Sequence, residues 1–306
     1  MRYYKIHQGP QNTYAKLALE QGFVGIGFSI PDISKLNFSS SSLREEIREI
    51  YTQSHLESTK ASIASATGMI FRFVTTIEIG DIVLMPLGDG TYRVGEITGD
   101  YFYAGLLEPI PHRRSVLWRG VLVKDSFSKS FKNTLGAIAT ISDVTHQSAE
   151  IEALLSGNTA RVESVQANMD QSEFALEKHL EDFLIKNWAN TDLGREYDLL
   201  TDENGEFIAQ QYLTEVGPID ILAIKQDKSE ILILELKKGR SGDAVVGQML
   251  RYITAVKKEI LEDNQKIRAI ILTGQDDKKI RYSLEALNGM IEFMIYKISF
   301  TITNIM

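Results

Sequence analysis

The chain has 306 residues, of which 43% are hydrophobic and 24% are charged, and its formal net charge is −8. This balance is typical of a soluble globular protein, and the length allows two domains. The absence of cysteine excludes disulfides, thiolate zinc sites and cysteine nucleophiles. The five histidines form no pair at helical spacing, which argues against a zinc enzyme. Because the sequence shows neither a secretory signal nor a long apolar run, we expect a cytoplasmic protein with no membrane partner.

The N-terminal half begins with helical patterns and continues with short β-rich runs. Helices are predicted over residues 14–21 and 43–55, with an apolar strand over 23–30 between them. From residue 71 to 105 short apolar runs alternate with turns, and Gly88-Asp89-Gly90 has the composition of a hairpin turn. Two further strands are predicted over 115–123 and 136–141. Short strands closed by glycine turns indicate a small β-barrel-like domain over residues 1–145.

The second half of the chain has an α/β pattern. A polar stretch over residues 146–171 predicts a helical linker, and a helix with an apolar stripe begins after Ser172. Strands are predicted over 196–200, 206–213, 219–224, 231–236, 267–272 and 291–298, and helices over 243–261 and 278–287. This order predicts a mixed sheet flanked by helices over residues 172–306. The expected fold class is therefore a two-domain α/β (α+β) protein.

Charged residues lie at the start of one apolar predicted strand of the C-terminal half and at the end of the next. Glu235 and Lys237 are two residues apart at the end of one strand, so their side chains project from the same face. Asp220 begins the preceding strand, and the short polar connection between the two strands predicts a hairpin. Two carboxylates and a lysine would then meet at one place, where oxygen ligands suit Mg²⁺ or Mn²⁺. The alternative is that Asp220 caps a turn while Glu235 and Lys237 face solvent on an edge strand.

The segments ALEKHLEDFLIKNW, GPIDILAI and ILILELKKGRSGDAVVGQMLRY carry a family resemblance. They resemble the PD-(D/E)xK nuclease superfamily, most closely the C-terminal domain of NucS-like (EndoMS) endonucleases. The resemblance implies a restriction-endonuclease-like fold in which Asp220 and Glu235 bind the metal and Lys237 is catalytic. The proline of the superfamily's leading Pro-Asp pair is replaced here by Ile219, with Pro218 one place earlier.

The same resemblance adds three further residues to the expected active site. Gln248 and Tyr252 match a Gln-x-x-x-Tyr feature, and their spacing places them on one helical face, with Gln248 near the scissile phosphodiester. Glu177 matches a helix acid that completes the metal site. The alternative for Glu177 is a surface acid beside Lys178 and Glu181.

The N-terminal half is similar to Mrr-type restriction proteins that carry a PUA/EVE-like barrel. The resemblance lies in residues 71–105 and in the following HRRSVLW. It implies a domain that recognises DNA and flips a modified base. Arg113 and Arg114, in a basic run over 112–132, would then contact phosphates. The aromatic side chains that would stack on the base are Trp118, Tyr101, Tyr103 and Phe28. The alternative is that these side chains pack the core of the domain.

Together these features predict a metal-dependent endodeoxyribonuclease whose partner is DNA. The leading hypothesis is a restriction or defence nuclease that recognises DNA, including modified DNA. The alternatives are a NucS-like repair nuclease for mismatched or branched DNA and a non-catalytic nucleic-acid-binding module. The apolar segment over 290–306 predicts a homodimer contact, with a further strand of the same subunit as the alternative.

Overall fold

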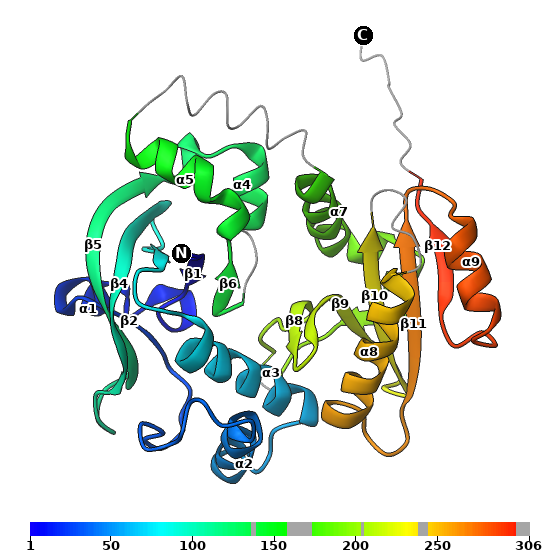
Figure 1. Ribbon diagram of the computed structural model, residues 1–306, viewed down its shortest axis with the longest axis horizontal. Helices are drawn as coiled ribbons and strands as arrows, with labels where there is room; N and C mark the ends of the chain where they lie inside the picture. Colours follow the sequence, from blue (N-terminus) through cyan, green and yellow to red (C-terminus); the bar gives the residue numbers. More distant parts are fainter. Residues whose placement is uncertain (136–138, 158–172, 203–204, 238–243, 298–306) are drawn as a thin grey trace.

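The computed structural model describes residues 1–135, 139–157, 173–202, 205–237 and 244–297. It contains two six-stranded sheets, one in each half of the chain, with helices around both (Figure 1). The expected two-domain α/β class is therefore confirmed. In the described ranges no helix combines the length and the apolar character needed to cross a membrane.

The N-terminal sheet has the strand order β2-β5-β4-β3-β1-β6. Only β1 and β3 run parallel, and the other neighbours are antiparallel. β4 and β5 are long and curve together (Figure 1). The end strands β2 and β6 are not paired with each other in the described residues, so the expected barrel is an open curved sheet. The strands are β1 (Tyr3–Ile6), β2 (Phe23–Ile26), β3 (Ile82–Pro86), β4 (Thr91–Tyr103), β5 (His112–Val123) and β6 (Ile141–Asp143).

Five described helices surround this sheet: α1 (Ala15–Gln21), α2 (Leu43–Ser54), α3 (Lys60–Phe71), α4 (Lys129–Thr134) and α5 (Ser148–Leu155). The β-rich pattern expected from residue 71 is wrong at its start, because α3 continues into a π-helical turn over Arg72–Thr76. Nine of the twelve residues of α3 are buried. The helix therefore has no solvent-exposed polar face, and its sequence lacks the alternation of apolar and polar residues that marks an amphipathic helix. Its start is fixed by Thr59, whose side chain accepts a hydrogen bond from the backbone of Ser62.

The expected linker is helical where it is described, but α5 is part of the N-terminal domain. Ile151 of α5 is fully buried in a core cluster with residues of the sheet. The buried carboxylate of Glu150 accepts hydrogen bonds from the backbone nitrogen (2.6 Å) and hydroxyl (2.7 Å) of Ser128. Residues 158–171 of the linker lie outside the described residues.

The C-terminal sheet has the order β12-β11-β10-β9-β7, and β8 also pairs with β9. The three strands β10, β11 and β12 are parallel, and β9 is antiparallel to β10. The strands are β7 (Tyr197–Leu199), β8 (Gln210–Thr214), β9 (Gly217–Lys225), β10 (Glu230–Lys237), β11 (Lys266–Thr273) and β12 (Glu292–Ile295). The helices are α7 (Glu173–Lys186), α8 (Ala244–Glu259) and α9 (Lys278–Glu285).

Both faces of the central strands are buried. Ile231 and Ile233 of β10 share a core cluster with α8, whereas Leu232 and Leu234 share another with Leu180 of α7. This two-sided burial explains why the β10 sequence is continuously apolar until its last residues.

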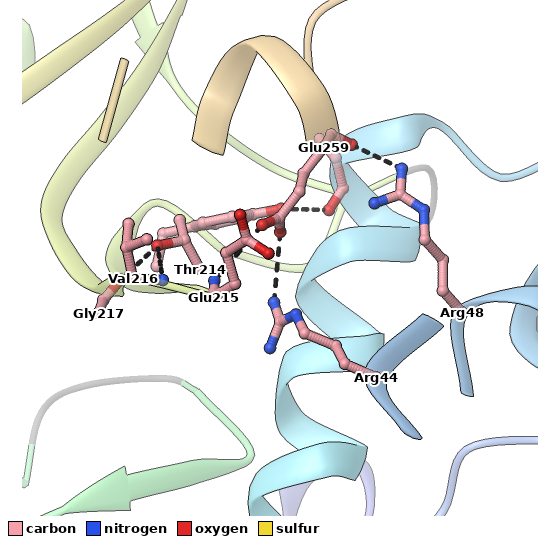
Figure 2. Close-up of polar contacts among 9 residues, drawn as sticks. Arg44, Arg48, Thr214, Glu215, Val216, Gly217 and Glu259 are labelled. Carbon is pink, nitrogen blue, oxygen red and sulfur yellow. Dashed lines mark hydrogen bonds and ion pairs between the residues drawn. The ribbon is translucent and has the colours of Figure 1, made fainter. Parts of the chain in front are cut away.

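Helix α3 packs against β8 and α8 of the C-terminal domain, and α2 lies beside α3 (Figure 1). Tyr212 of β8 donates a hydrogen bond to the carbonyl of Ala61 in α3 (2.6 Å). Arg44 and Arg48 of α2 both reach Glu259 at the end of α8, one through its carboxylate and the other through its carbonyl (Figure 2). Since α3 contacts β8 as well, the two domains share a packed interface beside the strand pair that carries Asp220.

Candidate active site

The hairpin of β9 and β10 brings Asp220, Glu235 and Lys237 together. Ile221 pairs with Leu234, so the antiparallel register places Asp220 opposite Glu235. The backbone nitrogen of Leu236 donates to Oδ2 of Asp220 at 2.8 Å. The Lys237 ammonium lies 2.9 Å from Oε1 of Glu235. Two carboxylates and one lysine therefore meet where β9 begins and β10 ends, as the sequence spacing predicts.

The electrostatics of this cluster disfavour two ionised carboxylates. Glu235 is only 1% exposed, and Asp220 is half-buried. Burial, followed by the negative charge of Glu235, raises the pKa of Asp220 to about 7. The hydrogen bond from Leu236 and the charge of Lys237 act in the opposite direction and do not outweigh it. A cation bound at this position would remove the repulsion between the two acids.

A third acid joins the cluster through a glutamine. The Gln211 side chain on β8 donates from Nε2 to Oδ1 of Asp220 (3.0 Å) and to Oε2 of Glu181 (2.8 Å). Glu181 belongs to α7 and is only 3% exposed. The side chain of Glu177, the helix acid expected from the sequence, lies outside the described residues. The structure thus connects Glu181, one helical turn later, to Asp220.

Gln248 and Tyr252 lie on one face of α8, as their spacing predicts. The Tyr252 hydroxyl accepts a hydrogen bond from Nε2 of Gln248 (2.8 Å) and donates one to the carbonyl of Pro218 (2.5 Å). Burial is the main cause that raises the pKa of Tyr252 to about 12, so the hydroxyl stays protonated near neutral pH. Tyr252 therefore holds β9 two residues before Asp220, which is a positioning role.

The donor set fits a magnesium or manganese ion. Asp220 and Glu235 carry carboxylate oxygens, the kind of ligand that these hard cations prefer. Across the described residues, no three acidic or histidine side chains are close enough to form a ready metal cluster. One or two carboxylates suffice for Mg²⁺, which keeps several water ligands. The adjacent Asp220 and Glu235 meet that requirement.

The two arginines predicted to contact phosphates lie inside the N-terminal domain. Arg113 is 5% exposed and Arg114 is 4% exposed. Arg113 donates from Nε to the carbonyl of Ile110 (2.7 Å) and forms an ion pair with Glu108. Arg114 donates from Nε to the carbonyl of Phe73 (2.9 Å). This corrects the expectation for both residues, because each guanidinium group is directed to groups of its own domain.

The aromatic residues proposed to stack on a base also contribute to packing. The buried Tyr101 pairs through its hydroxyl with Nδ1 of His112 (2.8 Å), and the Tyr103 ring lies 5.2 Å from the His112 ring. Trp118 is half-buried against two core clusters. Phe28 meets Tyr51 edge to face. These contacts agree with the alternative, in which the aromatics pack the core.

The segment predicted to form a homodimer contact is described only in part. Residues 292–295 form β12, which pairs with β11 of the same chain. Residues 298–306 lie outside the described part, so the homodimer stays a prediction.

Two family models match the chain, one in each half. Residues 177–288 match the endonuclease NucS C-terminal domain, and residues 4–144 match a domain of unknown function (DUF8426). No curated protein matches the chain in sequence. The resemblance of the N-terminal half to Mrr-type restriction proteins stays a prediction.

Solved structures of two nucleases show limited likeness to this chain. The complex of EndoMS with double-stranded DNA is 19% identical over 39% of this chain and 43% of that chain, with a TM-score of 0.30. A repair endonuclease from Pyrococcus abyssi is 14% identical over 70% of this chain and 66% of that chain, with a TM-score of 0.26. The chain therefore spans less than two thirds of either protein. Since the NucS match includes every described residue of the acidic cluster, the C-terminal domain is similar to the C-terminal domain of NucS endonucleases.

Proposed function

We propose that this protein is a divalent-metal-dependent endonuclease that hydrolyses phosphodiester bonds in DNA. The observation that carries the proposal is the meeting of Asp220, near the start of β9, with Glu235 and Lys237 at the end of β10. Charged side chains on two largely buried strands are costly for folding, and such arrangements cluster at functional sites. The match to a nuclease domain over residues 177–288 supports the same reading.

Asp220 and Glu235 would hold Mg²⁺ or Mn²⁺. When bound, the ion supplies a Lewis acid for the scissile phosphate and lowers the pKa of a bound water. Lys237 keeps 22% of its side chain exposed, so its ammonium can stabilise negative charge that develops on a phosphate. Tyr252 fixes the strand that carries Asp220, and the half-buried Gln248 lies beside it to orient substrate.

For the substrate we favour mismatched or branched DNA, as for a repair nuclease. The specific support is that the NucS match covers the whole described acidic cluster, from Glu181 to Lys237. Restriction of DNA, including modified DNA, is the second candidate, because a separate domain precedes the nuclease domain. The burial of Arg113 and Arg114 weakens that candidate by removing two of its proposed phosphate contacts.

A cleavage panel tests the proposal. It compares matched, mismatched, branched and single-stranded DNA with cytosine-modified plasmid, each with Mg²⁺, Mn²⁺ or EDTA, and uses Asp220→Ala as the inactive control. Cutting of mismatched or branched DNA alone supports repair, whereas cutting of modified plasmid alone supports restriction. DNA binding without cutting under every metal condition would make the protein a non-catalytic binding module.

A further inference from the structure

Gln211 occupies an unusual place between two acids of the candidate site. Its single Nε2 atom donates one hydrogen bond to Glu181 on α7 and another to Asp220 on β9. An amide NH₂ group has two hydrogens, so these two bonds use its full donor capacity. The amide therefore fixes two carboxylates that come from different elements at a common point.

The backbone of Gln211 is held in a left-handed conformation. Its φ is 51°, a region that residues other than glycine rarely adopt and that recurs at functional sites. The adjacent residues are both in the ladder with β9, where Gln210 pairs with Ile221 and Tyr212 pairs with Ile219. The ladder continues on both sides of the strained residue, so the strain is confined to the residue that reaches the acids.

Both neighbours of Gln211 are anchored by side-chain hydrogen bonds. Gln210 donates from Nε2 to Oδ1 of Asp182 on α7 (2.8 Å), and Tyr212 donates to the carbonyl of Ala61 on α3 (2.6 Å). β8 is thus tied to α7 and α3 without any contribution from Gln211. A purely structural role in joining β8 to α7 is already filled by the bond between Gln210 and Asp182.

We propose that Gln211 is a positioning residue that directs Glu181 and Asp220 toward one divalent cation. The inference rests on the proposed metal-dependent function and adds Glu181 and its glutamine partner to that site. Groups that orient metal ligands through hydrogen bonds commonly contribute about 10–100-fold to metal affinity or activity.

Calorimetric titration of Mn²⁺ into the full-length protein tests this role. We expect Gln211→Ala to weaken Mn²⁺ binding by about 10-fold or more, the lower part of the range for such orienting groups. The matched control is Gln210→Ala, which removes a hydrogen bond between the same two elements but leaves Asp220 untouched. It should keep the wild-type affinity.

Two further variants separate the amide from the backbone strain and from folding. Gln211→Gly accepts the positive φ without strain, so it should fold at least as well as Gln211→Ala yet show the same loss of Mn²⁺ affinity. Adding Glu181→Gln to Gln211→Ala should weaken binding by less than the product of the two separate effects, because the residues act as a unit.

Three results would overturn the role of Gln211. They are wild-type affinity in Gln211→Gly, an equal loss in Gln210→Ala, and a wild-type protein that binds no Mn²⁺. Failure of the proposed function looks different. A wild-type protein that binds Mn²⁺ but cleaves no DNA would refute the nuclease activity, and the titrations would still decide the role of Gln211.

Discussion

Arg44 in the N-terminal domain forms an ion pair with Glu259 in the C-terminal domain, with 3.3 Å between Nη2 and Oε2 (Figure 2). Both side chains are largely buried, and the other carboxylate oxygen of Glu259 accepts a hydrogen bond from the backbone of Glu215, next to the start of β9. The pair thus connects α2 to the turn that leads into the strand of Asp220.

Arg44→Ala should destabilise the whole protein. Removing one member of a largely buried pair leaves the other charge without compensation, and we expect a loss of roughly 2 kcal/mol, discounted from fully buried pairs for the remaining exposure. Thermal unfolding measures the effect. The matched control is Lys16→Ala, which breaks the exposed pair of Lys16 with Glu20 and should change stability by less than about 0.5 kcal/mol. Equal effects in the two variants would contradict the prediction.

Asp220→Asn should abolish cleavage and also stabilise the metal-free protein at pH 8. The pKa of Asp220 is about 7 in the folded protein against an ordinary value of 3.8, so the folded state retains a proton that the unfolded state has lost. Wild-type stability therefore falls as pH rises from about 4 to 7. The Asp220→Asn variant has a neutral side chain at this position, so its stability does not fall for this reason.

Denaturant unfolding in EDTA at several pH values measures this difference. It should be on the order of 1 kcal/mol at pH 8 and should shrink toward zero near pH 4, where the carboxyl is protonated in both states. A difference between wild type and Asp220→Asn that does not change with pH would show that another interaction causes it.

Lys237→Ala should remove turnover while metal binding persists. We propose that the ammonium stabilises negative charge on the phosphate and does not hold the ion. Its removal should therefore lower the cleavage rate by about 100-fold or more. Gel-based cleavage and Mn²⁺ titration test the two parts separately. Lys266→Ala, at the exposed start of the adjacent β11, is the control and should remain active. Loss of Mn²⁺ affinity in Lys237→Ala would assign the lysine to the metal site instead.

Tyr252→Phe should lower both stability and activity. The change leaves the carbonyl of Pro218 without its donor and releases β9 near Asp220, at a cost of about 1–2 kcal/mol. We expect cleavage to decrease by about 10-fold, as for other groups that orient a ligand. Thermal unfolding and initial cleavage rates measure both effects. Tyr282→Phe, whose side chain is 73% exposed, provides the control. Unchanged cleavage in Tyr252→Phe would rule out the positioning role.

Local periodicity was sufficient to predict the central part of the site. Glu235 and Lys237 share a face because side chains alternate on a strand, and Gln248 and Tyr252 share a face because they are one helical turn apart. The short connection between β9 and β10 then brings Asp220 to Glu235. Each of these relationships depends on residues within one element or one hairpin.

The parts that sequence patterns missed depend on contacts between distant elements. Gln211 lies opposite Asp220 in the ladder of β8 and β9, but its positive φ and its bond to Glu181 depend on how α7 packs beside β8, which sequence spacing does not predict. Glu177 and Glu181 are one turn apart on the same helix, so spacing alone does not tell which of them joins the site. The bonds of Gln211 on β8 connect Glu181 to Asp220. Arg113 and Arg114 are adjacent in β5 and both buried, because that part of the sheet is covered on both faces.

Helix α3 belongs to two hydrophobic cores at once. Ile63, Ala66 and Ile70 pack with the N-terminal sheet, whereas Ala61 and Ala64 pack with α8 and the C-terminal sheet. An evolutionary exchange of the N-terminal half between relatives would therefore have to preserve the α3 surface that meets β8 and α8. The modularity suggested by two separate family matches is limited by this shared helix, and the two halves are expected to be inherited as a unit.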